Sequence, residues 1–213
     1  FHIVPRCPPI VVVELASLCN LNCIMCDYPF MKRKKIIMDF NLVKKVIKEC
    51  ADFGVSRVVL SRVGEPLLHP KIGEIISFAK ECGIRNVSMV SNGMLLSEDK
   101  ARELIESGLD LITFSVDASN KTTFERIRPG SNFDTVIGNI EKFIKIRNDL
   151  SREKPWVEIN SCLMRENIEE VPLIIEKWRS IVERIRVLPV APLPQTKDQR
   201  IFDTLQGCGK KPC

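Results

Sequence analysis

The sequence predicts an α/β fold, a partial (β/α)6 TIM-like barrel built on parallel strands. Two observations lead to this prediction. Short β-branched runs alternate along the chain with segments of helical periodicity. Most of these runs are continuously apolar, as expected when both faces of a parallel strand are buried. The number of runs falls short of the eight strands of a closed barrel. The six expected strands are Ile10–Glu14, Arg57–Ser61, Asn86–Val90, Leu111–Val116, Trp156–Leu163 and Arg184–Leu188.

Helices are expected between the strands, because apolar residues there recur on one helical face. Ser97 precedes the third helical segment as its expected N-cap. Gly54, Gly83 and Gly108 each follow a helical stretch, where a C-cap glycine belongs. These β/α units should repeat with right-handed crossovers. The apolar residues that share one helical face are Leu42, Val43, Val46, Ile47 and Cys50; Ile72, Ile75, Ile76 and Ala79; and Ala101, Leu104 and Ile105.

The composition is that of an ordinary globular chain. Of its 213 residues, 45% are hydrophobic and 28% are charged, enough for one sizeable domain with a full core. No apolar run is long enough to span a bilayer and no signal-peptide pattern opens the sequence, so we expect no membrane partner and a cytoplasmic location. The formal charge of +5 suits an anionic ligand but does not indicate a nucleic acid.

The domain is expected to span residues 1–190, with residues 191–213 as a linker, since the tail is rich in proline and polar residues. The chain starts at Phe1 instead of methionine and ends at Cys213, so we expect a piece of a longer polypeptide. Two connections, residues 15–38 and 117–133, are too long for one helix. Both follow the C-terminal end of a strand, where β/α barrels place their chemistry.

Three of the nine cysteines lie within eight residues, as Cys19, Cys23 and Cys26. Three thiolates on one loop are soft ligands that suit zinc or an iron–sulfur cluster. A structural zinc site needs four protein ligands, and no further cysteine or histidine lies nearby in sequence, while Asp27 would be an unusual ligand. Zinc with a remote fourth ligand, or three incidental cysteines, are the alternatives.

The CxxxCxxC loop after an apolar first strand resembles the radical S-adenosylmethionine (SAM) superfamily. The resemblance implies a [4Fe-4S] cluster held by the three cysteines, with its fourth iron open to the amino and carboxylate groups of SAM. Reduction at low potential then cleaves SAM to a 5′-deoxyadenosyl radical that abstracts a hydrogen from the substrate. Met25 stands where this family commonly has an aromatic residue, and it still offers an apolar contact.

Later motifs extend the resemblance. Gly64-Glu65-Pro66 resembles the family's GGEP motif, with Val63 in place of the first glycine, and Glu65 suits the SAM ammonium. The resemblance also implies that Arg128 pairs with the SAM carboxylate, which an arginine can bind bidentately. The residues assigned to SAM in this way are Gly64, Glu65, Pro66, Asn92, Ser115, Asp117, Arg128, Leu163 and Leu188.

Several of these residues have plainer interpretations. Taken alone, Gly64-Glu65-Pro66 is a turn with a solvated glutamate, and Arg128 is a surface arginine before a turn. Asn92 belongs to a common Asn-Gly turn. Leu163 and Leu188 are expected to pack in the core, with adenine contact as the alternative. No residue is assigned as a catalytic acid or base.

Other chemically suggestive residues are expected to be structural. His69 should be a turn residue, and the basic run of residues 32–35 a solvated loop. Cys7, Cys50, Cys82 and Cys162 are isolated in sequence and are not assigned to metal. Cys208 and Cys213 differ, because the stretch 115–139 and the ending Lys-Pro-Cys resemble the SPASM/twitch subgroup. That resemblance implies an auxiliary iron–sulfur cluster in a C-terminal extension that this sequence lacks.

The resemblance implies an enzyme that abstracts hydrogen from a peptide or protein side chain, with a sugar or another small molecule as the alternative substrate. A low-potential electron donor such as flavodoxin or ferredoxin would be its partner. The rival hypothesis is a non-catalytic zinc- or iron–sulfur-binding domain with an interaction role.

Overall fold

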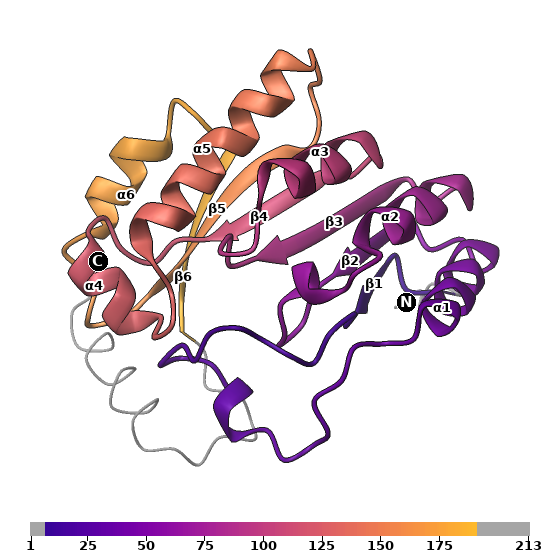
Figure 1. Ribbon diagram of the computed structural model, residues 1–213, viewed down its shortest axis with the longest axis horizontal. Coiled ribbons are helices and arrows are strands. Elements are labelled where there is room, and N and C mark those ends of the chain that lie inside the picture. The colour runs from indigo at the N-terminus through magenta and orange to yellow at the C-terminus, as the bar shows by residue number, and fades with distance from the viewer. Residues whose placement is uncertain (1–6, 191–213) are drawn as a thin grey trace, which may run out of the picture.

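The computed structural model describes residues 7–190 of the chain. Its six strands form one parallel sheet in the order β1-β2-β3-β4-β5-β6, and helices alternate with them (Figure 1). The sheet is open, since β1 and β6 lie at its two edges. The predicted α/β architecture of a partial, TIM-like barrel is confirmed. The strands are β1 (Ile10–Val13), β2 (Arg57–Leu60), β3 (Asn86–Ser91), β4 (Leu111–Ser115), β5 (Trp156–Leu163) and β6 (Arg184–Pro189).

The helices cap as the sequence predicts. Ser97 Oγ accepts a hydrogen bond from the backbone of Lys100 at 3.2 Å and begins the third helix. Gly54, Gly83 and Gly108 have φ angles of 79°, 89° and 86°, so each ends a helix in the conformation that only glycine adopts freely. The helices are α1 (Phe40–Asp52), α2 (Ile72–Glu81), α3 (Glu98–Glu106), α4 (Lys121–Ile127), α5 (Phe133–Asp149) and α6 (Val171–Trp178), with short 3-10 turns η1 (Tyr28–Phe30) and η2 (Pro66–Leu68).

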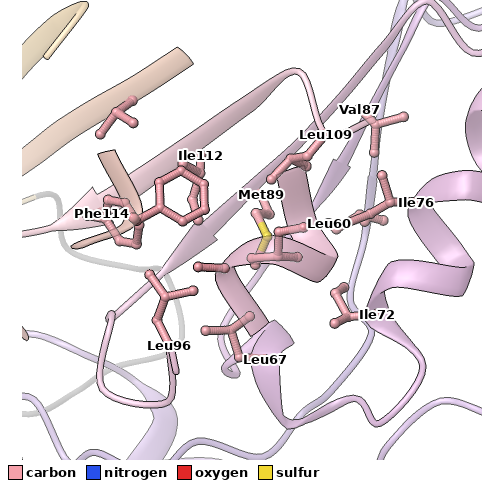
Figure 2. Packing of buried hydrophobic residues seen from close by; sticks show 14 of the residues in the cluster. Leu60, Leu67, Ile72, Ile76, Val87, Met89, Leu96, Leu109, Ile112 and Phe114 are labelled. Atoms are coloured by element: carbon pink, nitrogen blue, oxygen red, sulfur yellow. The ribbon is translucent and has the colours of Figure 1, made fainter. Parts of the chain in front are cut away.

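The core lies between the sheet and the helices. Alternate strand residues are buried on the helix-covered face of the sheet, with Leu60 and Met89 toward Ile72 and Ile76 of α2 (Figure 2). Phe114 of β4 lies edge-on to Phe143 of α5. One continuous cluster of buried apolar side chains includes residues from β1 to β5 and from all six α-helices, α1 to α6, and the partly buried Ile185 of β6 packs against it. Side chains alternate along a strand, so the strand residues outside this cluster face the opposite side of the sheet.

Two details differ from the prediction. The connection after β4 contains the short helix α4 before α5 begins, so only part of residues 117–133 is irregular. Leu188 was expected to pack in the core but is 48% exposed on the edge strand β6. The predictions for the tail, including those for Cys208 and Cys213 and the linker at 191–213, concern residues outside the described part of the chain. Within the described part, no helix is long and apolar enough to cross a membrane.

The structural interpretations of His69 and the basic run are confirmed. The His69 ring is buried and hydrogen-bonds the Met38 carbonyl at 3.1 Å, while its other ring nitrogen accepts from the backbone of Lys71. Residues 32–35 are exposed. Arg33 forms an ion pair with Glu14, and Lys35 lies over the Tyr28 ring.

Candidate functional site

The three cysteines lie on the long segment between β1 and α1, drawn in indigo and purple across the bottom of Figure 1. Its two ends are held together at the base. The Ser17 backbone donates to the Ile36 carbonyl and that of Met38 to the Leu15 carbonyl, both at 2.8 Å. An antiparallel bridge joins Ala16 to Ile37. The segment therefore leaves and re-enters the fold at a fixed place, and residues 18–35 form a closed loop, called here the cysteine loop.

A first clamp on the cysteine loop comes from the exit of β2. The Glu65 backbone N–H donates to the Leu18 carbonyl at 2.7 Å. A Cβ at position 64 would overlap the Ala16 carbonyl oxygen and lie 2.5 Å from that of Leu18, so only glycine fits there. The sequence resemblance assigns Gly64 to SAM. The structure shows a further requirement, since Gly64 permits close backbone contact with the start of the loop.

A second clamp comes from the end of α4. The backbone N–H of Asn22 donates to the Pro129 carbonyl, and that of Ile24 donates to the Ile127 carbonyl, each at 3.0 Å. Gly130 follows with a φ of 92°, and a Cβ there would lie 3.4 Å from the Asn20 carbonyl oxygen. The cysteine loop is thus fastened on both sides of Cys23 by connections that leave β2 and β4. The sequence alone provides no signal for these backbone pairings.

Glu65 is buried, not solvated, which overturns the plainer interpretation of its motif. Only 2% of the residue is exposed. Its Oε1 accepts hydrogen bonds from Leu67 N at 3.1 Å and Ser91 Oγ at 2.9 Å, and its Oε2 accepts from Asn92 N at 2.8 Å. Burial outweighs these bonds and raises the pKa of Glu65 to about 7. A carboxylate offers about four acceptor positions, so one position on Oε2 stays available for a ligand ammonium.

Asn92 connects the end of β3 to the cysteine loop. Its Nδ2 donates to Asn20 Oδ1 at 2.8 Å and lies 3.9 Å from Cys19 Sγ. Its Oδ1 accepts from the backbone of Met94 at 2.9 Å, which defines which way the amide points. Asn92 is 6% exposed. The structure therefore brings Asn92 and Cys19 together, although 73 positions separate them in the sequence.

Arg128 and Asp117 form a buried ion pair, so the interpretation of Arg128 as a surface arginine is wrong. Arg128 Nε and Nη2 donate to Asp117 Oδ2 at 2.7 Å and 2.6 Å. Asp117 Oδ1 accepts from the Cys162 backbone at 2.8 Å. Arg128 Nη1 lies 3.7 Å from Cys23 Sγ. Arg128 is 6% exposed and Asp117 is fully buried. The pair joins α4, β4 and β5 to the cysteine loop.

The three thiols are free and partly exposed. Cys26 Sγ accepts a hydrogen bond from the Tyr28 backbone at 3.4 Å. Burial raises the pKa of all three thiols, that of Cys23 to about 11 although the nearby Arg128 cation lowers it. Within residues 7–190, no three His, Cys, Asp or Glu side chains already converge as a metal site. Three free thiols on one clamped loop are nonetheless donors of the kind that hold iron–sulfur clusters, and ligation would deprotonate them.

The remaining assigned residues lie near the same edge of the sheet, at the ends of strands or just after them. Pro66 is buried at the start of η2, after Glu65. Ser115 ends β4 and is paired in register with Asn160. Leu163 ends β5, where its carbonyl accepts from the Val190 backbone at 3.3 Å. Leu188 lies on β6 opposite Cys162 and is half exposed.

Cys162 is isolated in sequence but not in space. Its thiol lies on β5 near the Asp117–Arg128 pair and the cysteine loop. Burial, followed by the Asp117 charge, raises its pKa to about 11, and Cys23 and Cys26 contribute. It also packs with Met25 against a small cluster of Ile127, Met164 and Val190. Met25 therefore makes the apolar contact expected of it. Only the sheet register, which puts β5 beside β4, brings Cys162 here.

The comparison with known families decides the identity. The model of the radical SAM superfamily matches residues 13–177, which include the cysteine loop and every clamp described above. The chain belongs to the radical SAM superfamily. Membership of the radical SAM superfamily implies a [4Fe-4S] cluster and SAM, in agreement with what the resemblance of the CxxxCxxC loop implies.

Curated radical SAM relatives include a tungsten-containing aldehyde ferredoxin oxidoreductase cofactor-modifying protein from Pyrococcus furiosus. It is 27% identical over 198 residues, which are 90% of this chain and 54% of the relative. A probable GTP 3′,8-cyclase from Methanococcus maripaludis is 30% identical over 191 residues, 89% of this chain and 61% of the relative. The chain therefore spans between about half and two-thirds of the length of these relatives.

Solved radical SAM structures share the fold. SuiB from Streptococcus suis bound to S-adenosylmethionine superposes with a TM-score of 0.72 at 16% identity, covering 94% of this chain and 47% of SuiB. The protein anSMEcpe with bound AdoMet and a peptide superposes with a TM-score of 0.68 at 20% identity, covering 90% of this chain and 54% of that one. At these identities the likeness establishes the fold alone.

Proposed function

We propose that this chain is the SAM-cleaving core of a radical enzyme that abstracts a hydrogen atom from its substrate. The observation that carries the proposal is the double clamp on the cysteine loop. The Gly64–Glu65 and Ile127–Gly130 segments hold the loop that bears Cys19, Cys23 and Cys26 at the exits of the strands. A merely incidental group of cysteines would not need such a scaffold. Family membership supports the same conclusion.

In this proposal Cys19, Cys23 and Cys26 hold the cluster. Glu65, with its free acceptor position, receives the SAM ammonium beside Gly64 and Pro66. Asn92 and Ser115 supply polar contacts, Asp117 orients Arg128, and the two remaining N–H groups of the Arg128 side chain are directed to the SAM carboxylate. Leu163 and Leu188 are proposed to contact the adenine ring of SAM. When bound, the cluster and SAM supply a low-potential electron and a 5′-deoxyadenosyl radical.

The first candidate substrate is a peptide or protein side chain. The open edges at β1 and β6 leave a partial barrel that would admit a large substrate. Two of the structural neighbours hold a peptide, so this fold accommodates one: SuiB with its precursor peptide and anSMEcpe with a peptide. An auxiliary cluster of the SPASM/twitch kind would accompany such a substrate. It would draw on Cys213 together with further cysteines of a C-terminal extension.

A second candidate substrate is a small anion, and one feature of the sheet favours it. On the face away from the helices, Glu158 is buried and its Oε1 lies 2.6 Å from Arg186 Nη2. Arg184 Nε lies 3.3 Å from Glu158 Oε2. The two arginine side chains remain about half exposed, at 51% and 45%, so one carboxylate faces two accessible cations. Relatives named probable GTP 3′,8-cyclase are consistent with such a substrate.

The test of the core function is chemical. The chain is purified without oxygen, and iron, sulfide and zinc are assayed; the formation of 5′-deoxyadenosine from SAM is then measured with and without dithionite. We expect iron and sulfide in equal amounts, and dithionite-dependent 5′-deoxyadenosine that disappears in Cys23→Ala. One zinc without sulfide would support the rival interaction domain instead. The natural reductant is proposed to be a flavodoxin or ferredoxin in the cytoplasm.

A further inference from the structure

The side chain of Arg128 is placed between Asp117 and Cys23. One edge of the guanidinium, Nε and Nη2, donates to Asp117 Oδ2 at 2.7 Å and 2.6 Å. The remaining nitrogen, Nη1, lies 3.7 Å from Cys23 Sγ, within hydrogen-bonding distance of sulfur. Because the guanidinium is planar, the contact with Asp117 determines where Nη1 points. The positive member of the ion pair therefore faces the thiol and the negative member lies behind it.

Asp117 is itself held rigidly, so it can orient Arg128. Its Oδ1 accepts from the Cys162 backbone at 2.8 Å, and its backbone carbonyl accepts from Asn167 Nδ2 at 2.7 Å. Asp117 is fully buried and Arg128 is 6% exposed. Water screens such charges weakly, so their fields act strongly on a neighbouring group.

We propose that Arg128, oriented by Asp117, acts as a positioning residue that raises the reduction potential of the cluster which Cys23 would hold. The proposal rests on the cluster assignment made above and goes beyond binding of SAM. A cluster gains negative charge when it takes up an electron. A cation and an N–H donor next to a ligating sulfur stabilise that extra charge, and hydrogen bonds to the sulfurs are among the factors that set cluster potentials. The negative charge of Asp117 opposes this effect on the reduction potential, but more weakly, because Asp117 lies farther from Cys23 than Arg128 does.

The test is a redox titration of the cluster, followed by electron paramagnetic resonance, in the absence of SAM and substrate. The variants are Arg128→Gln, Asp117→Asn and the double variant with both changes. Arg126→Gln is the matched control, because Arg126 lies in the last turn of α4, two residues before Arg128, but is exposed. Omitting SAM separates this role of Arg128 from any contact with the SAM carboxylate.

We expect the midpoint potential to rise in Asp117→Asn, because the amide oxygen can still accept from Arg128 and orient it while the opposing negative charge is gone. It should fall in Arg128→Gln, where the negative Asp117 remains alone. The double variant should fall between the unsubstituted protein and Arg128→Gln, since it loses the cation and its opposing charge together. Arg126→Gln should titrate like the unsubstituted protein, because solvent screens an exposed charge.

Equal potentials in all four variants, or a higher potential in Arg128→Gln, would overturn the proposal. If Arg128→Gln fails to fold because Asp117 is left buried and unpaired, the double variant decides, since two amides keep hydrogen-bonding groups in place. A double variant with an unchanged potential contradicts the proposal. If the unsubstituted protein takes up no cluster, the assignment of Cys23 fails and this proposal fails with it. A cluster that titrates as expected without yielding 5′-deoxyadenosine would contradict the proposed function alone.

Discussion

Gly64 lies against the backbone carbonyl of Ala16 so closely that no side chain fits between them. This contact joins the exit of β2 to the exit of β1, at the start of the cysteine loop. Together with the hydrogen bond from Glu65 N to the Leu18 carbonyl, this contact holds the backbone just before Cys19 in place. Gly64 belongs to a motif that resembles a SAM-binding motif, and it is also required for the backbone packing of the protein without ligand.

Replacing Gly64 with alanine should displace the cysteine loop. The new Cβ would overlap the Ala16 carbonyl, and because that neighbour is backbone it cannot rotate away. We expect a loss of stability of about 1–3 kcal/mol and reduced iron uptake. Urea unfolding and iron analysis measure the two effects.

Gly138→Ala is the matched control for this change. Gly138 lies within α5 and an added Cβ there would meet nothing within 4 Å. Alanine should raise stability there by about 0.5–1 kcal/mol and leave iron uptake unchanged. Equal effects of the two substitutions would contradict a special role for the contact between Gly64 and Ala16.

Glu65→Gln should destabilise the site although it preserves the shape of the side chain. Glu65 accepts from three donors, and an amide NH2 would point a donor at one of them. The expected cost is about 1–3 kcal/mol, measured by urea unfolding of the cluster-free protein. Glu74→Gln, which alters an exposed pair with Lys71, should change stability by less than about 1 kcal/mol. An unchanged Glu65→Gln protein would show that the Glu65 bonds contribute no net stability.

Asp110→Asn should remove a pH-dependent contribution to stability. Burial alone would raise the pKa of Asp110, but hydrogen bonds from Lys154, Lys80 and the Val87 backbone outweigh it and hold the pKa below its ordinary value of 3.8. A carboxyl with a lowered folded pKa stabilises the native state above its ordinary pKa. That contribution is lost as the pH falls through the folded pKa.

The unsubstituted protein should therefore exceed Asp110→Asn in stability by about 1–3 kcal/mol at neutral pH. The difference should shrink below about pH 4. Urea unfolding at several pH values measures it. Asp52→Asn, at an exposed pair with Lys48, is the control and should show little difference at any pH. A difference for Asp110→Asn that stays constant down to acidic pH would contradict the role of its ionised form.

The second candidate substrate can be tested with GTP as the probe. If Arg184 and Arg186 receive an anion, the cluster-loaded protein should bind GTP, and a double change of both arginines to glutamine should weaken binding at least about tenfold, the equivalent of 1.4 kcal/mol. Arg179→Gln, at an exposed arginine after α6, is the control. Calorimetric titration measures the affinities. No GTP binding by the unsubstituted protein, or equal binding by all variants, would leave the peptide as the better candidate.

Local patterns along the chain predicted the ends of the strands to within one residue, as in β1 and β6. The Ser97 cap and the C-cap glycines were also predictable, because capping depends on residues close together in sequence. The cysteine spacing led to the right family for the same reason, since three ligands on one loop need no tertiary information. Local patterns do not show which strand lies at the edge of the sheet. Leu188 was therefore wrongly expected in the core, because β6 has only one neighbouring strand.

The sequence by itself determined the parallel α/β fold, the cysteine loop and the family. Only the tertiary structure decided that Glu65 and Arg128 are buried, that Asn92 lies against Cys19, and that Cys162 joins the same edge of the sheet. The physical reason is the distance along the chain over which each property acts. Periodicity, caps and loop spacing depend on near neighbours, whereas burial and charge pairing depend on strand order, which brings together residues that are far apart in sequence.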